Sequence, residues 1–373
     1  MPVKTPGRLV LCSLAAILWM AAAVPVRAAL VTGLYEARVA VADQSSSARS
    51  AALQQAFATV LVKVTGARSV PTPLSAALGD AAHFVQQTRY EQVPADPNAP
   101  STASQTASLA LWVKFDSKAV NDAVAAAHAP VWGAERPRTL AWLALQDSPG
   151  GRLLPASDNS FLMQALQTAA QQRGITLMFP QMDAVDHSAL GVPDVAAFAV
   201  DRIRQASARY RPDAVLVGSI TPFGTGQYAA HWQLMSGTDQ QNWETPPGDE
   251  VVTAVDGVQV SADRYASRYA IAAGAGELTG VALTVQGITS LDIYAKVLGY
   301  LNGLTPVRAV HVQRMAQGSA YFTLDAHGTL DGLQSALVLG GLLTPGDSGT
   351  PAPATAPGAS TAITLLYRYV PSP

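Results

Sequence analysis

The sequence predicts an α+β protein of three modules, with mixed sheets and helices packed on them. Short apolar strands alternate with amphipathic helices along the chain, which favours layered sheets and helices over a fold of one element type. Apolar residues make up 49% of the sequence and charged residues 13%, a composition typical of a globular protein and unlike that of a disordered chain. The 373 residues exceed what one core usually serves, so we expect several domains.

The first 28 residues are typical of a secretory signal peptide. Lys4 and Arg8 precede an apolar run over 9–26, and the run ends on a small-residue cleavage pattern at 26–28. We expect cleavage before Ala29 and a periplasmic location. An uncleaved inner-membrane anchor is the alternative, because the run approaches the length of a membrane-spanning helix.

Composition limits the function classes further. Cys12, the one cysteine of the sequence, lies in this leader, so we expect no disulfide or thiolate nucleophile in the exported chain. The formal net charge is −2 and no cluster of Lys or Arg occurs, which argues against nucleic acid as a partner. No second long apolar run follows, so we expect no transmembrane segment after cleavage. The oligomeric state stays open.

The first module is expected over 29–136. The serines at 45–47 precede an apolar stripe at helical spacing, and Gly66 is placed to end that helix in a left-handed turn. Alternating apolar residues indicate a strand over 108–115. The expected elements are a strand at 34–41, helices at 45–66, 74–87 and 118–127, a strand at 108–115 and an exposed loop at 94–104.

The second module is expected over 137–276. The continuous apolar run over 214–220 is typical of a strand covered on both faces. The expected strands are 140–145, 175–179, 214–220, 227–235 and 242–255, and the expected helices are 161–172, 195–210 and 261–272. This order predicts a mixed sheet with packed helices.

The third module is expected over 277–373 and is predicted to be ferredoxin-like. The expected strands are 281–285, 307–313, 320–324 and 363–370, and the expected helices are 291–301 and 330–339. Their order, β-α-β-β-α-β, is that of a ferredoxin-like unit. A linker rich in Pro, Ala and Gly at 345–359 precedes the last strand.

The candidate metal or acid–base site is the loop that carries Asp183, Asp186 and His187. It follows a predicted strand, and loops at strand ends often hold ligands in α/β sheets. Two carboxylates and an imidazole suit a divalent ion. The alternative is a polar loop with capping aspartates, since loops are rich in Asp for turn reasons alone. No cofactor is expected.

The sequence contains no motif that is typical of nucleophilic catalysis. There is no Gly-x-Ser-x-Gly elbow and no Ser-x-x-Lys box. The segment 224–226 lacks the lysine of a phosphate loop and is expected to be a hairpin turn. Four tryptophans in or near predicted strands are expected in cores or at sheet edges, with a sugar-stacking platform as the alternative: Trp112, Trp142, Trp232 and Trp243.

Several short motifs of the first module give it a family resemblance. They are Leu34-Tyr35-Glu36, Val41-Ala42-Asp43-Gln44, Ala51 to Ala56, Val60 to Gly66, Val85-Gln86-Gln87 and Arg89-Tyr90. With them the chain resembles an uncharacterised family of proteobacterial exported proteins, numbered twenty sixty-six among the domains of unknown function. These are packing and capping motifs, so the resemblance assigns no catalytic residue.

The middle module carries a second, weaker similarity. Its segments at 173–175 and 213–218 are similar to envelope lipoproteins that activate penicillin-binding proteins, and to the amino-terminal domain of the Tol-system propeller protein. The resemblance implies protein binding, although a shared fold transfers function poorly.

These observations favour a non-enzymatic envelope protein that binds or scaffolds another envelope protein. One alternative is a metal-dependent hydrolase that uses Asp183, Asp186 and His187. The other is a protein that binds a small envelope ligand, such as a glycan or lipid, in a cleft between modules.

Overall fold

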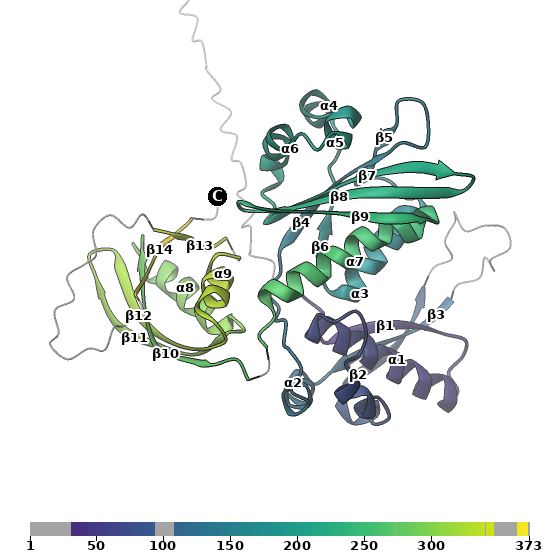
Figure 1. Cartoon of the computed structure of the whole chain (residues 1–373). Helices are drawn as coiled ribbons and strands as arrows, with labels where there is room; N and C mark the ends of the chain where they lie inside the picture. The colour runs from purple at the N-terminus through teal and green to yellow at the C-terminus, as the bar shows by residue number, and fades with distance from the viewer. Residues whose placement is uncertain (1–30, 94–107, 273, 340, 347–363, 372–373) are drawn as a thin grey trace, which may run out of the picture.

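The chain forms three modules, each built on its own sheet, as the computed structural model shows (Figure 1). The structure describes residues 31–93, 108–272, 274–339, 341–346 and 364–371. The leader expected at 1–28, the loop expected at 94–104 and the linker residues 347–359 lie outside these ranges. Helices and mixed sheets confirm the α+β class. None of the helices in the described ranges has the length and apolar character needed to cross a membrane.

The first module is an antiparallel sheet of order β1-β3-β2 with α1 packed on one face. Its elements are β1 (Glu36–Val41), α1 (Ser46–Thr65), the 3-10 helices η1 (Thr72–Leu78) and η2 (Ala81–Phe84), β2 (Val85–Val93), β3 (Ser108–Phe115) and α2 (Ser117–Ala126). The Ser45 side chain accepts a hydrogen bond from the Ala48 N–H at the start of α1. Gly66 ends the helix with φ 72°, so both predicted caps are confirmed.

The helix predicted over 74–87 is wrong. Two short 3-10 helices end at Phe84, and β2 then runs along β3. The polar sequence of β2 lacks the alternation that identifies a strand on its own, because this strand state comes from pairing with a distant partner.

The second module has helices on both faces of a mixed sheet of order β5-β4-β7-β8-β9, with β6 also paired to β4. Its strands are β4 (Arg138–Leu145), β5 (Arg152–Leu153), β6 (Thr176–Met178), β7 (Ala214–Gly224), β8 (Gln227–Ser236) and β9 (Asp239–Gly248). Its helices are α3 (Phe161–Arg173), α4 (Ala184–Ala189), α5 (Val192–Ala196), α6 (Val200–Ser207), η3 (Ala208–Tyr210) and α7 (Glu250–Tyr269). Figure 1 shows α3 and α7 on one face and α4, α5 and α6 on the other.

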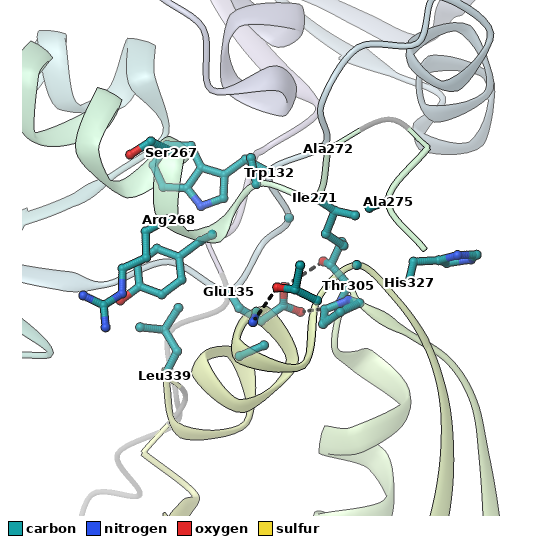
Figure 2. A pocket seen from close by; sticks show the side chains of 18 residues that line it. Trp132, Glu135, Ser267, Arg268, Ile271, Ala272, Ala275, Thr305, His327 and Leu339 are labelled. Atoms are coloured by element: carbon teal, nitrogen blue, oxygen red, sulfur yellow. Dashed lines mark hydrogen bonds between the residues drawn. The ribbon is translucent and has the colours of Figure 1, made fainter. Parts of the chain in front are cut away.

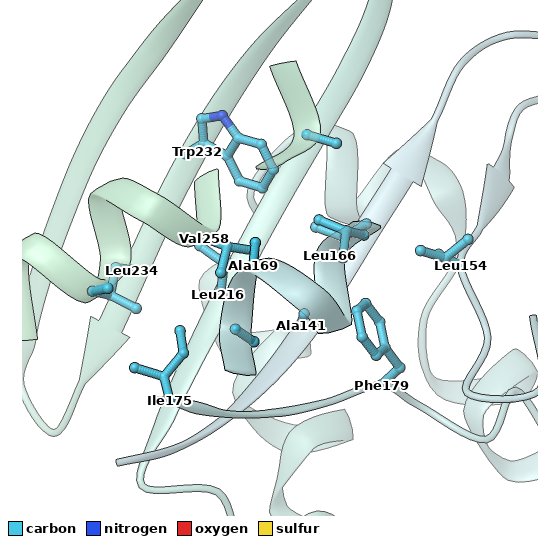
Figure 3. Close-up of a cluster of buried hydrophobic side chains, with 14 of the residues drawn as sticks. Ala141, Leu154, Leu166, Ala169, Ile175, Phe179, Leu216, Trp232, Leu234 and Val258 are labelled. Carbon is cyan, nitrogen blue, oxygen red and sulfur yellow. The ribbon is translucent and has the colours of Figure 1, made fainter. Parts of the chain in front are cut away.

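The larger core of this module lies between the sheet and the pair α3 and α7. Figure 3 shows Leu166 and Ala169 of α3 facing Leu216 of the sheet, with Trp232 and Val258 beside them. A smaller cluster fills the opposite face around the buried Trp142. β4 is buried on both faces from Thr139 onward, and its sequence is accordingly apolar from Leu140 to Leu145.

Two helix predictions in this module need correction. The strand predicted over 242–255 ends at Gly248, and α7 starts at Glu250 instead of Ser261. The Asp249 side chain accepts hydrogen bonds from the Val251 and Val252 N–H groups and caps α7. Several residues after this cap are β-branched, and such residues favour a strand when the cap that starts the helix is not recognised.

The helix predicted over 195–210 is broken into α5, α6 and η3. Phe198 has φ 53°, which a continuous helix does not allow, and it separates α5 from α6. The short helix α4 was not predicted.

The third module contains β10 (Glu277–Gln286), α8 (Leu291–Gly303), β11 (Val307–Ala316), β12 (Ser319–His327), α9 (Leu330–Leu339), β13 (Leu343–Pro345) and β14 (Thr364–Tyr369). The sheet order is β11-β12-β10-β14-β13. The ferredoxin-like order is present up to α9, but an extra strand follows it. β14 enters between β10 and β13 and runs parallel to β10, where a ferredoxin-like unit has an antiparallel neighbour.

The first and third modules repeat one arrangement. Each runs β-α-β-β-α, and in each the first strand pairs antiparallel with the third, which pairs antiparallel with the second. The outer edge of β10 is covered by β14. The corresponding edge of β1 pairs with no strand in the described part of the chain. The two modules therefore differ at this edge: a further strand covers it in the third module, and no described strand covers it in the first.

Candidate functional site

The predicted loop at Asp183, Asp186 and His187 lies at the start of α4. Asp183 caps this helix, and both of its carboxylate oxygens accept hydrogen bonds from Arg209 at 2.7 Å. These contacts hold the pKa of Asp183 well below its usual range, with the Arg209 hydrogen bond as the main cause.

Asp186 is buried and fully engaged. It accepts hydrogen bonds from Arg209, from the Met182 N–H and from the Tyr210 hydroxyl. His187 is exposed and lies in the last turn of α4. The described residues contain no group of three His, Cys, Asp or Glu side chains that is able to hold a metal ion. Asp183 therefore caps α4, whereas the oxygens of Asp186 are occupied by Arg209, Met182 and Tyr210.

The first two modules are joined by a buried arginine that the sequence did not single out. Arg136 donates hydrogen bonds to five backbone carbonyls, those of Lys63, Trp132, Gly133, Arg173 and Gly174. It therefore binds the C-terminal carbonyls of α1 and α3 at once, where helices leave such groups free. Burial lowers the pKa of Arg136 to about 9, which leaves it charged at pH 7.

Arg173 makes the second connection between these modules. Its guanidinium donates to the Gly66 carbonyl of the first module and to Asp263 and Gln259 of α7. Only 2% of this residue is exposed. The segment at 173–175, which suggested a similarity to envelope lipoproteins, thus has a local explanation as a helix end and an interface.

The free edge of β1 lies beside an open cleft of about 490 Å³. We call it the β1 cleft; its lining includes Glu36, Arg38, Lys63, Trp112, Gln171 and Thr176. The first four come from the first module, and the last two come from the end of α3 and the start of β6. The cleft therefore runs along the boundary between the first and second modules.

The backbone of β1 alternates between its two sides. The Tyr35 carbonyl accepts a hydrogen bond from the Phe115 N–H. The backbone N–H and C=O groups of the odd-numbered residues of β1 therefore point toward β3. Arg38 and Ala40 consequently direct their N–H and C=O groups away from the sheet. No described residue pairs with these four groups.

Basic residues dominate the sheet face next to this edge. Glu91 accepts hydrogen bonds from both Arg38 and Arg89 at 2.7 Å, and Arg89 stacks on Trp112 at 3.9 Å. Lys114 lies on the same face by strand alternation. Glu36 pairs with Lys114 on this face, so three cations face the two carboxylates of Glu36 and Glu91 and leave one excess positive charge.

Lys63 of α1 forms hydrogen bonds to the backbone at the start of β1. Its ammonium donates hydrogen bonds to the carbonyls of Gly33 and Glu36, at 3.4 and 2.8 Å. Burial lowers the pKa of Lys63 to about 8, and the nearby Arg136 contributes in the same direction.

A second, more enclosed cavity of about 220 Å³ lies between the second and third modules (Figure 2). Its lining includes Trp132, Arg268 and Tyr269, together with Thr305 and Leu339 of the third module. We call it the junction cavity. The Glu135 carboxylate accepts hydrogen bonds from the Thr305 N–H at 3.0 Å and from the Thr305 hydroxyl at 2.7 Å, and so ties the third module to the rest.

The predicted tryptophans occupy three kinds of place. Trp142 and Trp232 are buried, which confirms the core prediction for both. Trp243 stacks on Trp232 with ring centroids 6.1 Å apart, and Trp112 lies on the open face of the first sheet. The sequence did not predict the β1 edge or Trp132 as site features. Both become candidates only through the residues that surround them in space, and no local sequence pattern indicates this.

Comparison with known proteins corrects the family resemblance. Residues 28–133 match a domain of unknown function, DUF8605, and not the family numbered twenty sixty-six. No curated protein matches the chain, and nothing supports a similarity to activators of penicillin-binding proteins. The quoted motifs are helix caps and apolar stripes, which recur in unrelated proteins. The first module is therefore similar to DUF8605, and this match covers less than a third of the chain.

Proposed function

We propose that the chain is a non-enzymatic envelope protein that binds an extended segment of a partner protein along the outer edge of β1. The observation that carries this proposal is that no residue in the described ranges pairs with the outward backbone groups of Arg38 and Ala40. An unpaired strand edge is a template for one more strand, and peptide recognition often uses it.

The third module supplies an example within the same chain. There, β14 pairs in parallel with β10 from Ala282 to Gln286, on the edge that corresponds to the free edge of β1. Parallel addition to β1 would complete the first module in the same way. The open cleft beside β1 leaves space for such a segment.

The partner segment is expected to be acidic. Arg38, Arg89 and Lys114 lie on the outer face beside the edge and outnumber the carboxylates of Glu36 and Glu91 by one charge. Complementary charge speeds encounter and selects partners, and it weakens with added salt.

A pair of variants at Ala40 tests the proposal. A photoreactive residue at position 40 first identifies the contacting segment in the periplasm, and a synthetic peptide of that segment is then titrated against purified protein. Ala40→Pro removes the outward N–H, and we expect at least about tenfold weaker binding, while Ala40→Thr keeps the donor and the affinity. Equal binding to both variants would show that the edge is not the site.

We also propose that the protein is exported to the periplasm, on the support of the leader at 1–28. The mass of protein recovered from the periplasm tests this. A mature chain that starts at Ala29 is expected, and a full-length chain in the membrane fraction would favour the anchor alternative.

A further inference from the structure

The junction cavity contains one buried hydrogen-bond donor without an acceptor. Trp132 is only 1% exposed, and its indole Nε1–H finds no partner among the described residues. Figure 2 shows this nitrogen on the side of the ring that faces Arg268 and Leu339, across the cavity. A buried donor left unpaired costs about 1–3 kcal/mol, so a partner for it is expected inside the cavity.

The rest of the lining explains which ligands fit. Both oxygens of Glu135 are taken by Thr305, and the Arg268 guanidinium is paired with Asp239 at 3.1 Å. Asp239 balances the charge of Arg268, and the Glu135 carboxylate lies within Coulombic reach of Arg136, so neither group offers an unbalanced charge to a ligand. A charged ligand would lose its hydration without a counter-ion. Alkyl and ring surfaces of Tyr269, Ile271 and Leu339 make up much of the remaining wall.

We infer that the junction cavity binds a small, uncharged molecule with an apolar body and one hydrogen-bond acceptor, which receives the proton of Trp132 Nε1–H. The site is separate from the β1 cleft, since the two share no lining residue. It lies between modules, where ligand sites often form.

Close packing between Gly133 and Thr305 fixes the walls of the junction cavity. A Cβ atom on Gly133 would lie 1.9 Å from the Thr305 Oγ1, so only glycine allows the two modules to approach as they do. The short distance between Glu135 and Thr305 then fixes the third module over Trp132. Occupation of the cavity would add contacts from both modules and raise the stability of their docking.

The probe for this site is 2-piperidone, a six-membered ring with one carbonyl acceptor, and piperidine is its control. The control has the same ring but is protonated at pH 7 and lacks the carbonyl. Nitrogen-15 NMR of the full mature chain follows the indole N–H resonance of Trp132, which is assigned by its loss in Trp132→Phe. We expect 2-piperidone to shift this resonance in a saturable way and piperidine to leave it unchanged.

Two variants complete the test. Trp132→Phe keeps the apolar wall but lacks the donor, and we expect about tenfold weaker binding, followed through the Thr305 amide. Ala275→Leu fills part of the cavity without touching Trp132, so its indole resonance should persist but no longer respond. No shift up to millimolar probe, or equal shifts in the wild type and Ala275→Leu, would overturn the inference and leave Trp132 as a donor to trapped water.

Discussion

At the residue scale, Trp232 shows how glycine creates room for a core. A Cβ atom added to Gly257 of α7 would lie 2.4 Å from the Trp232 ring, and one added to Gly218 of β7 would lie equally close. The indole N–H donates to Thr245 at 3.0 Å, so the ring is fixed at its polar end as well. The position of this ring thus depends on both glycines.

Gly257→Ala is expected to destabilise the protein by about 1–3 kcal/mol, because the methyl group overlaps Trp232. Urea unfolding measures the change. Gly299→Ala in α8 is the matched control, since open space surrounds that position. There the same substitution is expected to stabilise by about 0.5–1 kcal/mol, through higher helix propensity. A neutral result at Gly257 would mean that the close packing is absent in solution.

Lys63 provides a pH-dependent test of the β1 anchor. Burial lowers its pKa to about 8, whereas the unfolded chain has a value of roughly 10.4. Between these values the unfolded state binds more protons, so the free energy of unfolding rises with pH, by up to about 3 kcal/mol. Below about pH 8 the unfavourable contribution of the charged amine is fully present.

Lys63→Met should lack the part of this rise that falls between about pH 8 and pH 9, because Arg136, with its pKa lowered to about 9, adds a rise of its own only at higher pH. Lys118→Met, at an exposed lysine, should keep the whole rise. Urea unfolding between pH 7.5 and about 10.5 compares the variants with the wild type. If the wild type and Lys63→Met have parallel pH profiles, Lys63 is not buried at the base of β1.

At the element scale, local signals decide which elements the sequence reveals. The limits of α1 were predicted because Ser45 and Gly66 act through their own neighbours. The start of α7 was not, because β-branched residues follow its cap at Asp249 and favour a strand when taken alone. β2 and the parallel entry of β14 depend on distant pairing, as does the free edge of β1 that forms the candidate site.

Asp249→Ala should cost about 1 kcal/mol, because it removes the acceptor of two N–H groups at the start of α7. Asp249→Asn keeps a capping oxygen and should cost much less. Thermal unfolding of both variants checks the cap. Equal losses would assign the effect to the charge at the helix N-terminus and not to the hydrogen bonds.

At the scale of the whole molecule, two sets of contacts join the modules. Buried Arg136 and Arg173 connect the first and second modules, and Glu135 with Thr305 connects the third. The β1 cleft runs along the first of these boundaries and the junction cavity along the second. Both proposed sites therefore depend on how the modules dock.

Arg173→Met should destabilise the first boundary by about 3 kcal/mol, because it leaves the Gly66 carbonyl and Asp263 without this partner. Calorimetry is expected to show the first module melting separately. Arg68→Met, which removes a more exposed pair with Asp263, should cost less than about 1 kcal/mol. A single unfolding transition in both variants would show that contacts other than those of Arg173 couple the first module to the second.

Amide hydrogen exchange of β1 tests the central claim most directly. The measurement compares the protein alone with the protein bound to the crosslinked partner segment. We expect new protection at Arg38 and Ala40, whose N–H groups point outward, and little change at Val39, whose N–H already points toward β3. Binding that leaves the Arg38 and Ala40 amides exchanging at their free rates would contradict strand addition at β1.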